Sequence, residues 1–181
     1  MGTIEAIKAD PNFGKAKFYT HTEWKGGAKV ETTSHKFEMP PGNMQVRDEP
    51  ITLVGDEPPA LLGDDAGPGP SETVLHGVAN CISVCNSYHS AASDIRVSDF
   101  KVEFEGDLDL QGFTDVNDTV TPAYKTIKCK ITARSGGTSH DELMAFVENI
   151  SQFSPIYDTV RNPVHVTFGL THNGQVVNGG A

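Results

Sequence analysis

The sequence has few basic residues. Its 181 residues include 14 Lys and Arg against 24 Asp and Glu, which gives a formal net charge of −10 at pH 7 and a pI near 5.0. Nucleic acids and anionic membrane surfaces are bound through clustered Lys and Arg. We therefore expect neither as a partner, and small molecules or other proteins remain.

The chain also lacks a long hydrophobic run. It has no stretch of about 18 apolar residues, the length that suggests a membrane-spanning helix. The start "MGTIEAIKADPNF" has neither the basic residues nor the apolar core of a secretion signal. Cysteine is scarce too, and three cysteines in so long a chain do not indicate a disulfide framework. We expect a cytoplasmic protein with free thiols.

The first part of the chain predicts a β-hairpin and then a long loop. Segments 16–24 and 28–39 carry β-branched and aromatic residues on either side of Gly26-Gly27. Residues 40–70 hold seven of the eleven prolines and three acidic pairs. This stretch is predicted to be a loop around the body of the protein, with a short strand at "ITLVG".

A helix is predicted from Pro70. Its apolar residues form two adjacent stripes at helical spacing. The first stripe contains Val74, Val78, Cys81, Cys85, Tyr88 and Ala92, and the second contains Leu75, Ala79 and Ile82. A helix that is apolar over most of its circumference is expected to be buried.

The rest of the chain alternates between strand and helix patterns. Strands are predicted at 95–113 and 124–133, the second with Cys129 on a core face. A capping box at "SHDE" starts a second helix, which Ser154-Pro155 interrupts. A short turn around "YDTVRNP" and a last strand at 164–170 follow.

This order predicts an α+β fold with a mainly antiparallel sheet. We expect an N-terminal extension at 1–15, a single domain at 16–170 and a flexible tail at 171–181. The central helix needs more apolar partners than one small sheet provides. A homodimer that packs two such helices together is therefore predicted.

Cys81 and Cys85 raise the question of chemistry. Helix positions i and i+4 lie about 5–6 Å apart at Cβ, whereas a disulfide needs roughly 3.5–4.5 Å, so this pair cannot bridge within an intact helix. His89 continues the stripe, but eight residues of helix rise about 12 Å, too far for all three to bind one metal. No metal site and no cofactor are predicted.

Two interpretations of the thiols stay open. Both can be small core residues, since free Cys is among the most buried residue types. A reactive thiol needs a lowered pKa, and Cys81 lies too far into the helix for the helix dipole to supply it. Lys29, Arg161 or a neighbouring His would have to act instead.

Two stretches of the chain carry a family pattern. They are "DEPITLVGDEPPALLGDDAGPGPSETVLHGVANC" and "SPIYDTVRNPVHV". They contain, in order, a Gly-x-x-Pro loop, a carboxylate near a helix start, a Cys eleven positions after that Pro, a Ser-or-Cys-Pro step and an Asn-Pro-Val strand. Over roughly residues 16–170 the chain resembles the OsmC-like superfamily, which includes the osmotically inducible and organic hydroperoxide resistance proteins.

The resemblance implies an intertwined α+β homodimer with active sites at the subunit interface. It also implies a thiol peroxidase in which one Cys attacks the peroxide and a second Cys resolves the sulfenic acid, while an Arg and a Glu orient the first thiolate. Cys81 matches the attacking position. Ser154 replaces the usual resolving Cys, Glu72 is one position beyond the usual Glu, and Lys29 is the nearest match to the Arg.

These departures leave two functional hypotheses. In the first, the protein reduces organic hydroperoxides as part of the defence against oxidative stress. Cys81 is then the nucleophile, Lys29 or Arg161 its activator and Glu72 the residue that orients the cation, while Cys85 or an external thiol regenerates Cys81. In the second, a non-catalytic dimer binds a small apolar molecule at the subunit interface.

Overall fold

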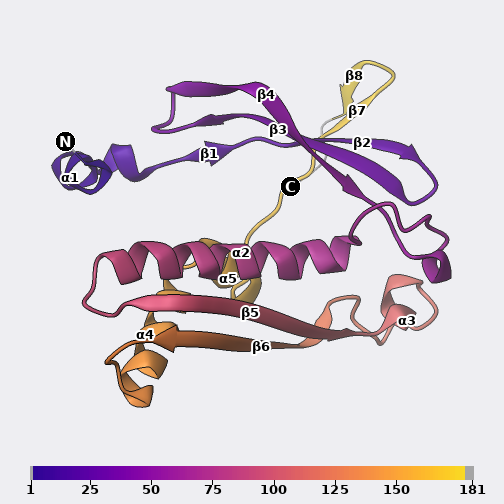
Figure 1. Cartoon of the computed structure of the whole chain (residues 1–181). Coiled ribbons are helices and arrows are strands. Elements are labelled where there is room, and N and C mark those ends of the chain that lie inside the picture. Colours follow the sequence, from indigo (N-terminus) through magenta and orange to yellow (C-terminus); the bar gives the residue numbers. More distant parts are fainter. Residues whose placement is uncertain (1, 178–181) are drawn as a thin grey trace. The chain divides into compact units, whose positions relative to one another are not determined.

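The computed structural model describes residues 2–177, which form an α+β fold with antiparallel sheets (Figure 1). The described residues make two compact units, which divide between residues 74 and 75. The division falls inside helix α2, between Val74 and Leu75.

The first unit is built on a four-stranded antiparallel sheet in which β3 pairs with the three other strands. The predicted hairpin is confirmed as β2 and β3. Gly26 and Gly27 connect them with φ angles of 103° and 58°, which side chains other than glycine rarely adopt. The elements are α1 Thr3–Ala9, a 3₁₀ turn Pro11–Gly14, β1 Lys17–Phe18, β2 His21–Gly26, β3 Lys29–Glu38 and β4 Met44–Gly55.

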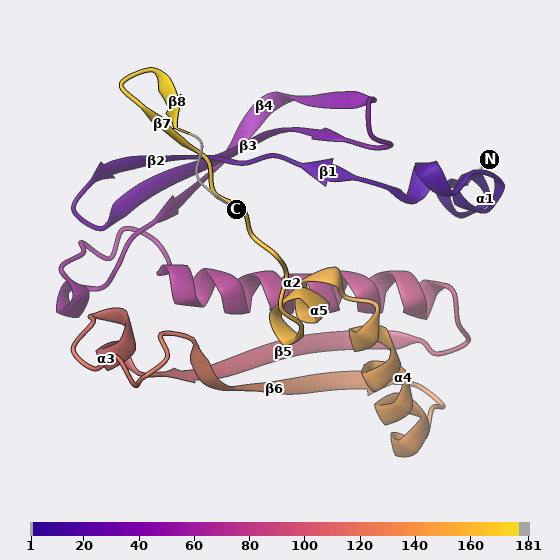
Figure 2. The ribbon, with the colours of Figure 1, turned by 180° about the vertical axis from the view of Figure 1, so that it is seen from behind.

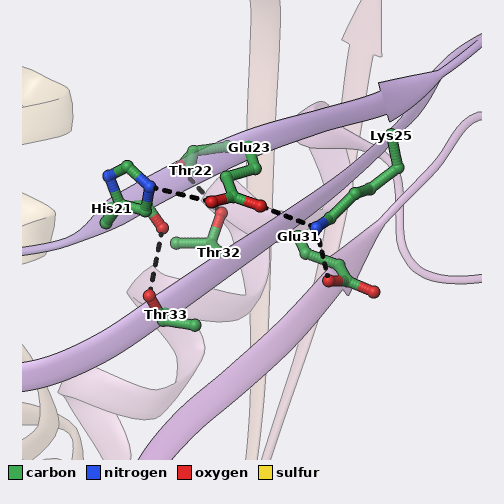
Figure 3. Close-up of polar contacts among 7 residues, drawn as sticks. All are labelled: His21, Thr22, Glu23, Lys25, Glu31, Thr32 and Thr33. Atoms are coloured by element: carbon green, nitrogen blue, oxygen red, sulfur yellow. Dashed lines mark hydrogen bonds and ion pairs between the residues drawn. The ribbon is translucent and has the colours of Figure 1, made fainter.

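Polar side chains join β2 to β3 across the hairpin (Figure 3). Lys25 Nζ lies 2.7 Å from Glu23 and 3.2 Å from Glu31. Thr22 and Thr32 share a hydrogen bond of 2.9 Å. The contacts between the two strands help to fix the register of β2 against β3 on this exposed surface. The charge of Lys25 is balanced by two carboxylates.

The predicted loop at 40–70 is wrong for its first half. Residues 44–55 form the long strand β4, of which the expected "ITLVG" strand is only the end. The prolines misled the prediction, because Pro50 can be accommodated in a strand where the ladder is broken. The β3–β4 register shifts between Ser34 and Lys36, opposite this part of β4.

The second half of that segment is a loop, organised by the buried carboxylate of Asp56. Asp56 Oδ1 accepts a hydrogen bond from Glu57 N, and Oδ2 accepts from Asp64 N and Ala66 N, at 2.9, 3.1 and 3.1 Å. These donors, Ala66 first, hold the pKa of Asp56 below its usual value, and Lys29 contributes through its charge. The loop also contains a 3₁₀ turn, Pro59–Leu61.

Helix α2 spans Pro70–Ala91, which confirms the predicted helix. Its burial differs from the prediction. Val78, Ile82, Cys85 and Asn86 are buried, but Val84 and Tyr88 are 51% and 74% exposed. Helix α2 is therefore buried along one stripe, while Val84 and Tyr88 form a neighbouring exposed strip, called the bare stripe below.

The second unit packs α2 against a two-stranded sheet and a helix. Strand β5, Val97–Leu108, pairs with β6, Tyr124–Ser135, and α3, Leu110–Phe113, follows β5. Helix α4, His140–Gln152, begins at the predicted capping box. The core cluster joins Cys85 of α2 to Phe146 and Ile150 of α4.

Two predictions near the C-terminus are wrong. Residues 155–161 form the helix α5, Pro155–Arg161, rather than a turn, because proline is well suited to the first helical position. The predicted strand at 164–170 is absent except for Leu170, and Val164, Val166 and Phe168 are exposed. Their alternation is typical of a strand, but no edge in the described chain pairs with it.

Ser154 connects α4 to α5. Its side chain is fully buried, and its Oγ accepts a hydrogen bond from Tyr157 N at 3.2 Å, so it caps α5. Figure 2 shows α5 beside α2, and an added Cβ on Gly77 of α2 would lie 3.7 Å from Ile156. Ser154 therefore holds a helix that packs on α2.

The chain ends in a small hairpin of β7, Leu170–His172, and β8, Gln175–Val177. The predicted flexible tail at 171–181 includes this hairpin, and its last four residues, 178–181, lie outside the described residues. The extension at 1–15 and the single domain at 16–170 stay predictions.

The carboxylate of Asp56 gives a pH-dependent prediction. An asparagine side chain has only one oxygen. In Asp56→Asn, some of the backbone N–H groups that now donate to the carboxylate would therefore face an NH₂ group, which cannot accept their hydrogen bonds. We expect the thermal unfolding midpoint to fall by several degrees at pH 7. Because folding lowers the pKa of Asp56 from 3.8, its stabilisation is complete above that pH and lost as the pH falls through the folded pKa.

Calorimetry from pH 7 down to about pH 2 should therefore show the wild type and Asp56→Asn converging in acid. Asp64→Asn, the same change at an exposed position of this loop, is the control and should leave the midpoint unchanged. A constant difference at every pH would contradict the account.

The cap at Ser154 gives a second prediction. Ser154→Ala leaves the Tyr157 N–H without its side-chain acceptor and should lower the free energy of unfolding by about 1–2 kcal/mol, measured by urea denaturation. Ser151→Ala is the matched control, because the Ser151 hydroxyl only bonds back to Val147 O within α4. An equal decrease in the free energy of unfolding in the two variants would contradict the role of Ser154 as the cap of α5.

Candidate functional site

Two thiols of α2 lie one helical turn apart. Cys81 is half-buried and Cys85 is buried, and both are free. The four-residue spacing is kept because α2 is helical throughout this region. The structure thus brings together the two cysteines that the sequence placed on one stripe.

The surroundings of the pair within the second unit are apolar. Cys85 forms the core cluster with Phe146 and Ile150, and Cys81 packs against it. The other side chains against the cluster are Ile95, Val97, Phe100, Leu143 and Val147. Cys81 therefore lies between a packed core and the bare stripe that contains Val84 and Tyr88.

The two thiols are not equivalent. Burial is the main cause that raises the pKa of Cys85, followed by the charge that Cys81 can carry and by a hydrogen bond with Cys81. Ionisation of Cys85 is therefore disfavoured relative to that of an ordinary exposed thiol. The nucleophilic role predicted for Cys81 stays a prediction.

Glu72 and Lys29 lie in the first unit. Glu72 is in the first turn of α2, where its Oε2 accepts a hydrogen bond from Gly69 N at 2.9 Å. This contact anchors the loop to the helix start. Lys29 begins β3, and its charge helps to lower the pKa of Asp56. The roles predicted for Glu72 and Lys29 toward Cys81 stay predictions.

Arg161 and the histidines of α2 are the other residues that could activate Cys81. Arg161 and His89 each contact other side chains. Arg161, in the last turn of α5, lies 3.7 Å from the Asp158 carboxylate and over the ring of Tyr157. His89 stacks on Phe153 with ring centroids 4.7 Å apart. His76 is exposed.

The second unit contains a groove that the sequence patterns did not predict, with a volume of about 660 Å³. Cys129 and Ile131 of β6 line it together with Ile82 of α2 and residues of α4 and α5, including Arg161. The prediction of Cys129 as a core residue is wrong, because this thiol is exposed in the groove. Alternation in β6 identified its face but could not say whether that face is covered.

Metal-binding clusters and membrane-spanning helices are both absent from the part of the chain that the structure describes. Residues 2–177 contain no group of three or more His, Cys, Asp or Glu side chains that could hold a metal ion. None of the helices in this range has the length and apolar character needed to cross a membrane.

Comparisons with known proteins agree with the fold. The chain resembles three solved structures, which cover 79–81% of it. The first is an OsmC-like protein from Mycoplasma pneumoniae, with 15% identity, coverage of 81% of this chain and 89% of that chain, and a TM-score of 0.60. The second is an OsmC-like protein of unknown function from Vibrio cholerae, with 12% identity, coverage of 79% of this chain and 92% of that chain, and a TM-score of 0.56. The third is an organic hydroperoxide resistance protein OsmC from Legionella pneumophila, with 18% identity, coverage of 81% of this chain and 92% of that chain, and a TM-score of 0.53. No curated protein sequence matches the chain.

The family is identified by the sequence itself. The family model described as OsmC-like protein matches residues 63–169, more than half of the chain. The matched range contains α2 with both thiols, β5, β6, α4 and α5. The chain therefore belongs to the OsmC-like protein family.

Proposed function

We propose that this protein is a thiol-dependent peroxidase that reduces organic hydroperoxides, with Cys81 as the nucleophile. The observation that carries the proposal is the position of Cys81, a half-buried free thiol at the edge of an apolar cluster. Such a site suits a substrate with an apolar group beside its peroxide. The name of the Legionella pneumophila relative, an organic hydroperoxide resistance protein, supports this choice.

The reaction uses one cysteine of the chain and an external thiol. The Cys81 thiolate attacks one peroxide oxygen, the O–O bond breaks, and the alkoxide takes a proton and leaves as an alcohol. Cys81 becomes a sulfenic acid, which condenses with an external thiol and releases water. A second external thiol then releases Cys81 and carries away a disulfide.

An external reductant is needed because Ser154 occupies the position of the second cysteine. A hydroxyl cannot form a disulfide, and this one caps α5 from a fully buried position. Lys29 is proposed as the cation that favours the Cys81 thiolate, and Glu72 as the residue that orients this cation. Lysine supplies charge without the two-pronged hydrogen bonding of arginine.

We also propose that the protein acts as a homodimer. Val84 and Tyr88 are exposed on α2, and Val164, Val166 and Phe168 are exposed after α5. Apolar surface of this extent is typical of an interaction site. A second copy that covers the bare stripe of α2 would enclose the surroundings of Cys81 and separate it from water.

A second candidate is a non-catalytic dimer that binds a small apolar molecule at the subunit interface. The serine at position 154 favours it, and the groove beside Cys129 offers a volume of the size that small ligands occupy. In this case Cys81 is alkylated slowly at pH 7 and an apolar molecule co-purifies with the protein. Rapid alkylation and a trapped sulfenic acid count against it.

The peroxidase proposal is tested by hydroperoxide consumption. With a dithiol present, the wild type should consume cumene and tert-butyl hydroperoxide, and Cys81→Ser should reduce the rate to that of the dithiol alone. Cys129→Ser removes an exposed thiol of β6 and should retain the activity. Equal rates in the wild type and Cys81→Ser would overturn the proposal.

The dimer proposal is tested by sedimentation velocity. Val84→Glu places a charge in the bare stripe of α2, and burying an unpaired carboxylate should weaken association on the order of ten-fold or more. Ala123→Glu adds the same charge at an exposed position just before β6, away from α2 in the sequence, and should leave the dimer intact. A wild type that sediments as a monomer at every concentration would contradict the proposal.

A further inference from the structure

We propose that the groove beside Cys129 binds an apolar carboxylate, a small molecule with a hydrocarbon chain and one carboxylate group, and that Arg161 holds the carboxylate. The residues that line this groove lie within 82–161, inside the second unit. Cys81 is not among them. The site is therefore separate from the proposed nucleophile, and it is formed by a single chain.

The floor of the groove is an uncovered part of an apolar sheet face. Cys129 and Ile131 alternate along β6 and line the groove, and Phe104 of β5 stands opposite Cys129 in the strand register. The intervening residues Lys128 and Lys130 form ion pairs with carboxylates of β5 at 2.8 and 3.2 Å. The two strands thus have a charged face that suits water and an apolar face that needs a cover. The groove is a place where the described chain leaves the apolar face open.

Helices α2 and α4 add further apolar side chains to the groove. Ile82 comes from α2, and Leu143, Met144 and Val147 come from α4. A volume of about 660 Å³ and a largely apolar lining with a few polar groups are typical of sites for small molecules. The lining therefore suits the hydrocarbon part of the ligand.

Arg161 supplies a positive charge that the chain itself leaves available. Among the described residues that line the groove, it is the one lysine or arginine. Its guanidinium lies over the ring of Tyr157, 5.5 Å from the ring centroid, and Ser154 caps the helix that carries both residues. The Asp158 carboxylate is 3.7 Å away, which is longer than a hydrogen bond. The guanidinium can therefore hold a ligand carboxylate through two parallel hydrogen bonds.

Glu148 restricts where the ligand carboxylate can lie. This residue of α4 also lines the groove, and it makes no ion pair with Arg161 in the described part of the chain. A carboxylate beside Glu148 would be repelled, whereas one at Arg161 is attracted. We therefore place the carboxylate at Arg161, with the hydrocarbon chain over Cys129 and Ile131. A ligand with an amino group would instead be attracted to Glu148, so the test includes an amine.

The test measures the binding of decanoate, below the concentration at which it forms micelles, by isothermal titration calorimetry. Arg161→Gln should weaken binding by about ten-fold or more, since the ligand loses charge-assisted hydrogen bonds. Arg161→Lys keeps the charge without the two-pronged geometry and should bind with intermediate affinity. Arg134→Gln is the matched control, because Arg134 of β6 pairs with Asp99 and does not line the groove. It should retain the wild-type affinity.

A second measurement locates the ligand. Decanoate should slow the labelling of the exposed Cys129 thiol by N-ethylmaleimide, read on the Cys129 peptide by mass spectrometry, because the hydrocarbon chain covers this thiol. Cys81→Ser should bind decanoate as the wild type does. Loss of the peroxidase proposal would therefore leave this inference standing, and the reverse also holds.

Three results would overturn the inference. One is the absence of decanoate binding, or equal affinity in the wild type and Arg161→Gln. Another is tighter binding of decylamine than of decanoate, which would assign the groove to a cation at Glu148. The third is slow labelling of Cys129 in the ligand-free wild type that becomes faster on dilution, which would show that a second copy of the chain fills the groove.

Discussion

The site depends on the packing of one stripe of α2 against α4 and β5. Cys85 contacts Phe146 and Ile150 in the core cluster, and this contact fixes how the helix is turned about its own axis. With that rotation fixed, Cys81 lies at the edge of the cluster, while Val84 and Tyr88 project to the bare side. Burial of Cys85 thus places Cys81 at the edge of the core.

The three cysteines of the chain occupy three environments. Cys85 is buried, Cys81 is half-buried and Cys129 is exposed in a groove of β6. Burial raises the pKa of Cys85. Ser154 serves as a buried helix cap. Each of the three thiols therefore has different surroundings.

Sequence patterns predicted the elements that local interactions decide. The start of α2, the capping box at Ser139 and the β2–β3 hairpin each follow from a few neighbouring residues. Prolines were misleading at β4 and α5, because Pro50 falls where the ladder is broken and Pro155 falls at a helix start.

Tertiary neighbours could not be predicted in the same way. Alternation placed Cys129 on the correct face of β6, yet whether that face is covered depends on distant residues. The strand pattern at 164–170 likewise requires an edge that the sequence does not specify. For the candidate site, spacing predicted that Cys81 and Cys85 share a stripe of α2, but only the structure distinguishes the buried thiol from the half-buried one.

The most direct test of the central claim is the redox state of each cysteine after one equivalent of organic hydroperoxide, measured by mass spectrometry with dimedone trapping. The account predicts a dimedone adduct on Cys81 and reduced thiols at Cys85 and Cys129. An unmodified Cys81 beside an oxidised Cys129, or no oxidation of any cysteine, would contradict it.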